Sequence, residues 1–210
     1  MGAQAGLIAA DETTANYIRE AGTDPGDIER WQGDEDAEYR AVHDFDVSGL
    51  EPQVALPHSP ATARPIGEAQ GTPIQQAYIG ACTGAKLLDL RMAAEVLQGR
   101  RVAPGTRLLV APASTRTTAA AAADGTLQIL TEAGAILMPS GCGACAGLGA
   151  GILAEGEVCI SSTARNFKGR MGSASSTVYL GSPYTVAAAA VSGAICDPRE
   201  LLVTGDSDDG

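Results

Sequence analysis

Three cysteines stand in two short segments whose composition suits metal or cluster chemistry. Cys82 lies in the segment YIGACTG, and Cys142 and Cys145 lie in the segment SGCGACAG. Each segment follows an apolar run that is typical of a β-strand, so we expect the sulfur atoms in glycine-lined loops at the end of a sheet. Backbone N–H groups of such loops can hydrogen-bond thiolates or inorganic sulfide and so tune a cluster.

The spacing supplies three thiolates, one fewer than a closed structural zinc site or an electron-transfer iron–sulfur site uses. A metal with one position left open can act as a Lewis acid on a hydroxyl or a carboxylate. The alternative is that these are small buried cysteines, because free cysteine behaves as a small hydrophobe and is often found in cores. Spacing alone leaves both interpretations open.

A third motif, RNFKGR from Arg165 to Arg170, follows the two cysteine segments. In this order and at these spacings, IGACT, GCGAC and RNFKGR resemble the aconitase and 3-isopropylmalate dehydratase (isopropylmalate isomerase) superfamily. The resemblance is greatest to the third, cluster-binding domain in large subunits of 3-isopropylmalate dehydratase and homoaconitase-like enzymes. It runs from about Met1 to Glu200.

The resemblance implies a cofactor and a reaction. Cys82, Cys142 and Cys145 would bind three irons of a 4Fe–4S cluster, and the fourth iron would bind the hydroxyl and a carboxylate of a di- or tricarboxylic hydroxy acid. Polarising the C–O bond makes the hydroxyl a better leaving group, so the resemblance implies a hydro-lyase that isomerises by dehydration and rehydration. The alternative is a non-catalytic iron–sulfur or metal-binding module.

Arg165 and Arg170 are the candidates for binding the substrate. A guanidinium pairs with a carboxylate through two short, charge-assisted hydrogen bonds, and the alternative for both is an ordinary surface arginine. Polar residues 161–163 are further candidates for hydrogen bonds near the cluster. His58, in a proline-rich segment, could hydrogen-bond a substrate or simply line a turn.

Two departures from the aconitase pattern bear on the substrate. Gln4 stands where aconitases carry an active-site glutamate, and Ala164 stands where they carry asparagine beside the first arginine. The resemblance therefore favours a 2-alkylmalate such as 3-isopropylmalate, and with it leucine biosynthesis, over citrate. Homoaconitate-like, citrate-like and dimethylmalate-like acids are the alternatives.

The resemblance also implies partners. Enzymes of this superfamily take their acid–base Asp–His pairs from two preceding domains, and a serine base and further arginines from a swivelling fourth domain. We therefore expect the chain to need N-terminal large-subunit domains and a small swivel-domain subunit for full activity. We expect no catalytic acid or base within this chain.

Composition bounds the remaining possibilities. The 210 residues suit one substantial domain. A net charge of −11 argues against nucleic acid and against anionic membranes, which attract basic surfaces. Five cysteines without a secretory signal peptide indicate a reducing cytoplasm. Cys159 and Cys196 stand in apolar segments and are expected to be plain core residues.

Apolar strand-like runs alternate with helical patterns, which is typical of an α/β domain with a mainly parallel sheet. Together with the resemblance, this predicts a three-layer αβα fold like the third domain of aconitases. The predicted strands are 76–79, 107–111, 135–138, 157–161 and 178–180, and the predicted helices are 15–21, 27–40, 87–97, 115–123, 127–133 and 184–191. Because functional groups gather at the carboxyl ends of parallel strands, Cys82, Cys142, Cys145 and Arg165 are expected on one rim.

The chain divides into three parts by composition. Residues 1–75 hold an N-terminal helix, an acidic connector and a proline-rich extended segment, all joined to the same domain. Residues 76–203 form the α/β cluster-binding core, and residues 204–210 form an acidic tail.

Overall fold

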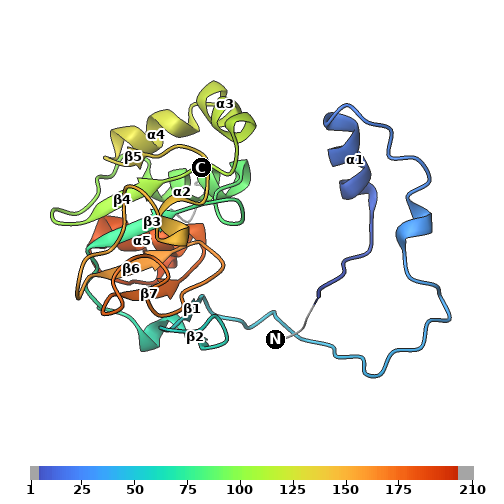
Figure 1. Cartoon of the computed structure of the whole chain (residues 1–210), viewed down its shortest axis with the longest axis horizontal. Coiled ribbons are helices and arrows are strands. Elements are labelled where there is room, and N and C mark those ends of the chain that lie inside the picture. Colours follow the sequence, from blue (N-terminus) through green and yellow to red (C-terminus); the bar gives the residue numbers. More distant parts are fainter. Residues whose placement is uncertain (1–4, 203–210) are drawn as a thin grey trace, which may run out of the picture. The chain divides into compact units, whose positions relative to one another are not determined.

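The computed structural model describes residues 5–202 (Figure 1). The chain divides into two compact units, Met1–Gly49 and Leu50–Gly210. Gln4 and the acidic tail predicted at 204–210 lie outside the described residues.

The first unit holds one helix, α1 (Glu12–Glu20), which Asp11 caps by accepting a 2.9 Å hydrogen bond from the Thr14 N–H. The prediction of a helix over residues 27–40 is wrong, because only a 3₁₀ turn, η1 (Glu29–Trp31), forms there. Gly33 interrupts this stretch, which carries six carboxylates against two arginines and has no apolar stripe to bury. Ala15 is the only apolar residue of the described part of this unit that is buried.

The second unit is built on a seven-stranded sheet in the order β2-β1-β7-β6-β3-β4-β5 (Figure 1). Its strands are β1 (Gln53–Ala55), β2 (Ala63–Pro65), β3 (Gln76–Ile79), β4 (Arg107–Val110), β5 (Ile136–Leu137), β6 (Val158–Ser161) and β7 (Thr177–Leu180). The five strands from β7 to β5 in this order are parallel. The α/β class and the mainly parallel sheet are therefore confirmed.

The hairpin β1–β2 was expected only as an extended segment. Its two strands pair antiparallel, with Val54 opposite Arg64, and Ala55 pairs with Leu180 of β7. This pairing makes residues 50–75 part of the second unit.

Side chains of the central strands alternate between two apolar clusters, as the two-residue period of a strand requires. Ala77 and Ile79 of β3 face one cluster, and Tyr78 faces the other. The first cluster contains the helices, namely α2 (Leu87–Leu97), α3 (Thr115–Ala123), α4 (Thr126–Glu132) and α5 (Pro183–Ser192). The second is covered by loops around the 3₁₀ helix η3 (Gly143–Ala146). Two further 3₁₀ turns are η2 (Ile66–Glu68) and η4 (Pro198–Glu200).

The handedness of crossover connections explains why helices and loops lie on different faces. The chain runs from β3 to β4 to β5 in one direction across the sheet, and later from β6 to β7 in the other. Right-handed connections that travel in opposite directions lie on opposite faces. The connection from β5 back to β6 travels in this second direction as well, so the loops that carry Cys142, Cys145 and the arginine motif cover the face without long helices, whereas the Cys82 loop leads into α2.

None of the helices within residues 5–202 is both long enough and apolar enough to cross a membrane.

Two leucines of α2 offer a matched test of the packing. Leu90 is fully buried in the helical cluster, whereas Leu88 is 67% exposed. We expect Leu90→Ala to lower the free energy of unfolding by about 3 kcal/mol, because it leaves a cavity. Leu88→Ala should change it by no more than about 0.5 kcal/mol. Urea denaturation followed by circular dichroism measures both, and equal losses would contradict this packing.

Candidate cluster site

The predicted site residues lie on loops that leave the same edge of the sheet. Cys82 follows β3, and Arg165 follows β6, which pairs directly with β3. Cys142 and Cys145 follow β5, which is joined to β3 through β4. Since these four strands are parallel, their carboxyl ends point the same way. Cys82 and Cys142 are exposed, and Cys145 is half-buried.

Ser162 fixes the backbone of the Cys82 loop. Its Oγ accepts a hydrogen bond from the Gly80 N–H at 3.1 Å and donates one to the Gly84 carbonyl at 2.7 Å. A Cβ atom at Gly84 would collide with the Ser162 carbonyl oxygen and lie 2.8 Å from that of Gly80. The sequence placed 161–163 among possible hydrogen-bonding residues, and the structure shows that the Ser162 partners are backbone groups of the cysteine loop.

Arg170 fixes the second cysteine loop. Its Nε donates a 2.8 Å hydrogen bond to the carbonyl of Cys145. The loop continues through Gly147, whose φ of +72° lies in the left-handed region, and a Cβ there would lie 3.1 Å from the Arg170 carbonyl oxygen. Ala144, between the two cysteines, is buried against the second cluster. The loop therefore has its backbone anchored while the Cys142 side chain is exposed.

Tyr78 lies beneath this loop and was not singled out from the sequence as a site residue. Its side chain is 1% exposed and lines a cavity of about 260 Å³ together with Gly143 and Ala144. Burial, and next the charge of the neighbouring Cys145 thiolate, raise the pKa of Tyr78 to about 12, although the nearby Cys145 backbone N–H opposes them. The phenol therefore keeps its proton at neutral pH and remains a hydrogen-bond donor beside the cysteines.

The two arginines of the third motif occupy different environments. Arg165 is exposed, and within residues 5–202 it has no hydrogen-bond or ion-pair partner. Arg170 is half-buried and bound to Cys145 as described above. A carboxylate ligand would therefore meet a free guanidinium at Arg165 and a partly engaged one at Arg170.

Asn166, between them, holds the arginine loop to the sheet. This fully buried side chain donates through Nδ2 to the carbonyls of Leu56, at 2.9 Å, and Val178, at 3.0 Å. Its Oδ1 is buried without a partner in the described part of the chain. The polar residue in an RNF motif could have suggested such a role, but one of its partners lies just after β1 and the other within β7.

The remaining candidates from the sequence lie away from the loops of Cys82, Cys142, Cys145 and Arg165, which together form the cysteine rim. Cys159 is completely buried, as predicted, and burial raises the pKa of its thiol to about 12. Cys196 is half-buried, with Sγ 3.1 Å from the Ser192 Oγ, and burial likewise raises its pKa. His58 is exposed in the turn between β1 and β2.

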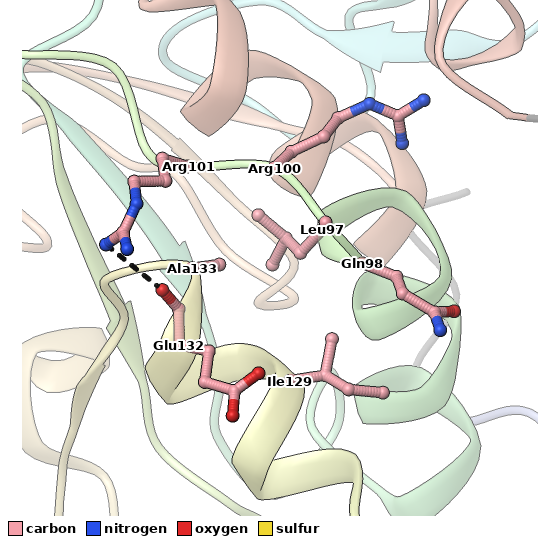
Figure 2. Close-up of a pocket in the computed structure, with 8 residues that line it drawn as sticks. Leu97, Gln98, Arg100, Arg101, Ile129, Glu132 and Ala133 are labelled. Atoms are coloured by element: carbon pink, nitrogen blue, oxygen red, sulfur yellow. Dashed lines mark hydrogen bonds between the residues drawn. The ribbon is translucent and has the colours of Figure 1, made fainter.

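A cavity of about 290 Å³ lies at the other end of the domain, where α2 ends and before β4 begins (Figure 2). Arg101 there donates a 3.4 Å hydrogen bond to the Glu132 carbonyl, and Figure 2 shows Arg100 pointing away from Arg101. None of the three cysteines of the rim contributes to it. This hollow is therefore separate from the cysteine chemistry.

The cysteine rim can be tested for its ability to hold a metal group. Within residues 5–202, no three side chains of His, Cys, Asp or Glu lie close enough together to bind a single metal ion. A multi-iron cluster requires a different geometry, because each iron takes its own thiolate and the sulfur atoms stand at separate corners. Three thiols on glycine-rich loops at one edge match this donor chemistry, so the residues fit a cluster better than a single ion.

Fold and rim together define an α/β domain that presents three cysteine thiols on loops at the carboxyl edge of a parallel sheet. The sequence matches the model of the aconitase family (aconitate hydratase) over residues 1–193. The chain belongs to the aconitase family, whose members generally carry an iron–sulfur cluster.

Curated relatives agree with this assignment. The chain is 47% identical to the 3-isopropylmalate dehydratase large subunit 2 of Archaeoglobus fulgidus over 96% of its own length and 48% of the relative. It is 48% identical, with the same coverage, to the 3-isopropylmalate dehydratase large subunit 1 of Methanopyrus kandleri. A probable methanogen homoaconitase large subunit of Methanosarcina mazei is 44% identical over 96% of the chain and 50% of the relative. The chain thus spans about half the length of the curated relatives it matches.

Glycine substitutions test the Cys82 loop. We expect Gly84→Ala to lower the free energy of unfolding by more than about 2 kcal/mol, because its Cβ would overlap backbone atoms that cannot move independently. Gly67→Ala is the control, because its Cβ would meet no atom within 4 Å, and it should change stability by no more than about 0.5 kcal/mol. Thermal or urea unfolding of the two variants decides, and equal stability would show that the loop is not packed as described.

Proposed function

We propose that this chain is the cluster-binding part of an iron–sulfur hydro-lyase that isomerises a 2-alkylmalate such as 3-isopropylmalate by dehydration and rehydration. The observation that carries the proposal is the placement of Cys82, Cys142 and Cys145 on loops at one carboxyl edge, beside the loop of Arg165. The names of the relatives support the reaction class and favour the isopropylmalate substrate.

The cysteines and arginines at this edge of the sheet have different roles in the proposed reaction. Cys82, Cys142 and Cys145 would ligate a 4Fe–4S cluster, which, when bound, supplies a Lewis-acidic iron that weakens the C–O bond of a substrate hydroxyl. Arg165, exposed and unpaired within residues 5–202, binds and orients a substrate carboxylate through bidentate hydrogen bonds. Arg170 contributes the same charge from a fixed position against the Cys145 loop.

The proposal includes partners. The relatives are named large subunits, and the chain spans 48% of the first of them. We therefore propose that further large-subunit domains and a small subunit supply the acid–base residues and complete the substrate site. We further propose that the complete enzyme acts in leucine biosynthesis and that it does so in the cytoplasm.

Homoaconitate chemistry is a second candidate, because the Methanosarcina mazei relative is named a probable homoaconitase. A complete enzyme reconstituted around this chain separates the two candidates, since 3-isopropylmalate and homocitrate differ in the number of carboxylates that the arginines must bind. Higher kcat/KM for homocitrate would favour this second candidate.

Iron binding tests the cluster assignment. After anaerobic reconstitution we expect about four iron and four acid-labile sulfide per wild-type chain, and a loss of both in Cys82→Ser. The matched control is Cys196→Ser, which removes a cysteine outside the rim and should retain the wild-type content. Little iron in the wild type, or equal iron in Cys82→Ser, would contradict the assignment.

A further inference from the structure

The turn around Cys145 is held by side chains from two other parts of the chain. The Cys145 carbonyl accepts the 2.8 Å hydrogen bond from Arg170 Nε, on the loop that follows β6. Tyr78, on β3, packs beneath the same turn, where its side chain lines a cavity together with Gly143 and Ala144. A Cβ built at the neighbouring Gly143 would lie 3.8 Å from the Tyr78 phenol oxygen, which places the phenol directly under the turn.

We propose that Arg170, which binds the Cys145 carbonyl, and Tyr78, which packs beneath the turn, are positioning residues that clamp the C-x-x-C loop for its cluster. The inference rests on the proposed function for its purpose, but the clamp itself is a property of the chain without a cluster. It assigns Arg170 a role in the loop that Arg165, in the same motif, does not share.

The loop needs such a clamp because its own backbone restrains it little. η3 contains four residues, and glycines with positive φ flank or interrupt it at 141, 143, 147, 149 and 151. Glycine loses the most conformational freedom on ordering, so each of these positions opposes a single loop conformation. The burial of Ala144 and the hydrogen bond from Arg170 to Cys145 oppose this entropy.

The two halves of the clamp differ in strength. The Arg170 bond has a charged donor, and charge-assisted hydrogen bonds are stronger than neutral ones. The Tyr78 phenol is neutral and nearly inaccessible to water, and its oxygen lies beneath Gly143, so it contributes packing against the turn. Tyr78 also joins the two cysteine loops, because its own carbonyl accepts from the Ser162 N–H at 3.0 Å and Ser162 holds the Cys82 loop.

Alkylation of the cluster-free chain tests the clamp. We would treat the native chain with iodoacetamide and follow each cysteine by peptide mass spectrometry. Arg170→Lys keeps the positive charge but lacks Nε, so the loop should open more often and Cys145 should react about tenfold faster than in the wild type. Arg165→Lys, the matched control, should leave the Cys145 rate unchanged.

The same digest controls for unfolding. Cys159 is completely buried and should stay unreactive wherever the core is intact. Equal Cys145 rates in Arg170→Lys and Arg165→Lys, with Cys159 still protected, would overturn the role of Arg170. If Arg170→Lys exposes Cys159, Tyr78→Phe becomes the deciding variant.

Tyr78→Phe removes only the hydroxyl and keeps the ring in the second cluster. Its Cys145 rate should rise about threefold, since loss of the phenol oxygen leaves a gap beneath Gly143. Tyr184→Phe is the control, because it also loses a hydroxyl, one that donates a 2.7 Å hydrogen bond to Glu95 on the helical face. Equal Cys145 rates in the two variants would overturn the role of Tyr78.

Cluster lifetime distinguishes failure of the clamp from failure of the proposed function. After anaerobic reconstitution, the visible absorbance of Arg170→Lys should decay several-fold faster in air than that of Arg165→Lys. A wild-type chain that takes up no iron would refute the proposed function, while the alkylation rates would still decide whether the clamp exists.

Discussion

The parallel pairing of β3 with β4 and β6 is the constraint on which the site depends. Residues 76–79 align with 107–110 on one side, and residues 76–78 align with 159–161 on the other. This register makes the loops after β3 and β6 leave the sheet side by side. Cys82 and the arginine motif are 83 residues apart in the sequence, yet they occupy neighbouring loops because of these backbone hydrogen bonds.

Side-chain hydrogen bonds to the loop backbones then fix the path of each loop. The loops are rich in glycine, so the sheet fixes where they begin but not the path they follow. Ser162 holds the Cys82 loop by two of its backbone groups, Arg170 holds the Cys145 carbonyl, and Tyr78 packs beneath the turn between the cysteines. In both loops the backbone is bound, while the thiols of Cys82 and Cys142 are exposed. Such loops are suited to a group that must be both held and accessible.

The elements of this fold differ in how far the sequence could predict them. The strands around 76–79 and 158–161 and the helix at 87–97 were predictable, because apolar runs and helical periodicity are local signals. The hairpin β1–β2 was not, since its strands are three residues long and its pairing with β7 is a distant contact. The predicted helix at 27–40 failed because acidic residues with a polar pattern suit a solvated chain as well as a helix.

The same division applies to the site. Cys82, Cys142 and Cys145 could be chosen from residue type and spacing, and the order of strands placed them on loops at one edge. The bond from Arg170 to Cys145 spans 25 residues, and that from Ser162 to Gly80 spans 82. No local pattern encodes such contacts, so Tyr78 and the backbone roles of Ser162 and Arg170 required the structure.

The central claim is that three cysteines from two loops serve one cluster. The most direct measurement is the alkylation pattern of the reconstituted chain, compared with that of the cluster-free chain under the same anaerobic conditions. The account predicts that Cys82, Cys142 and Cys145 become protected together and in proportion to bound iron, while Cys196 reacts at an unchanged rate. A chain that binds iron but leaves any one of the three as reactive as before would contradict the account.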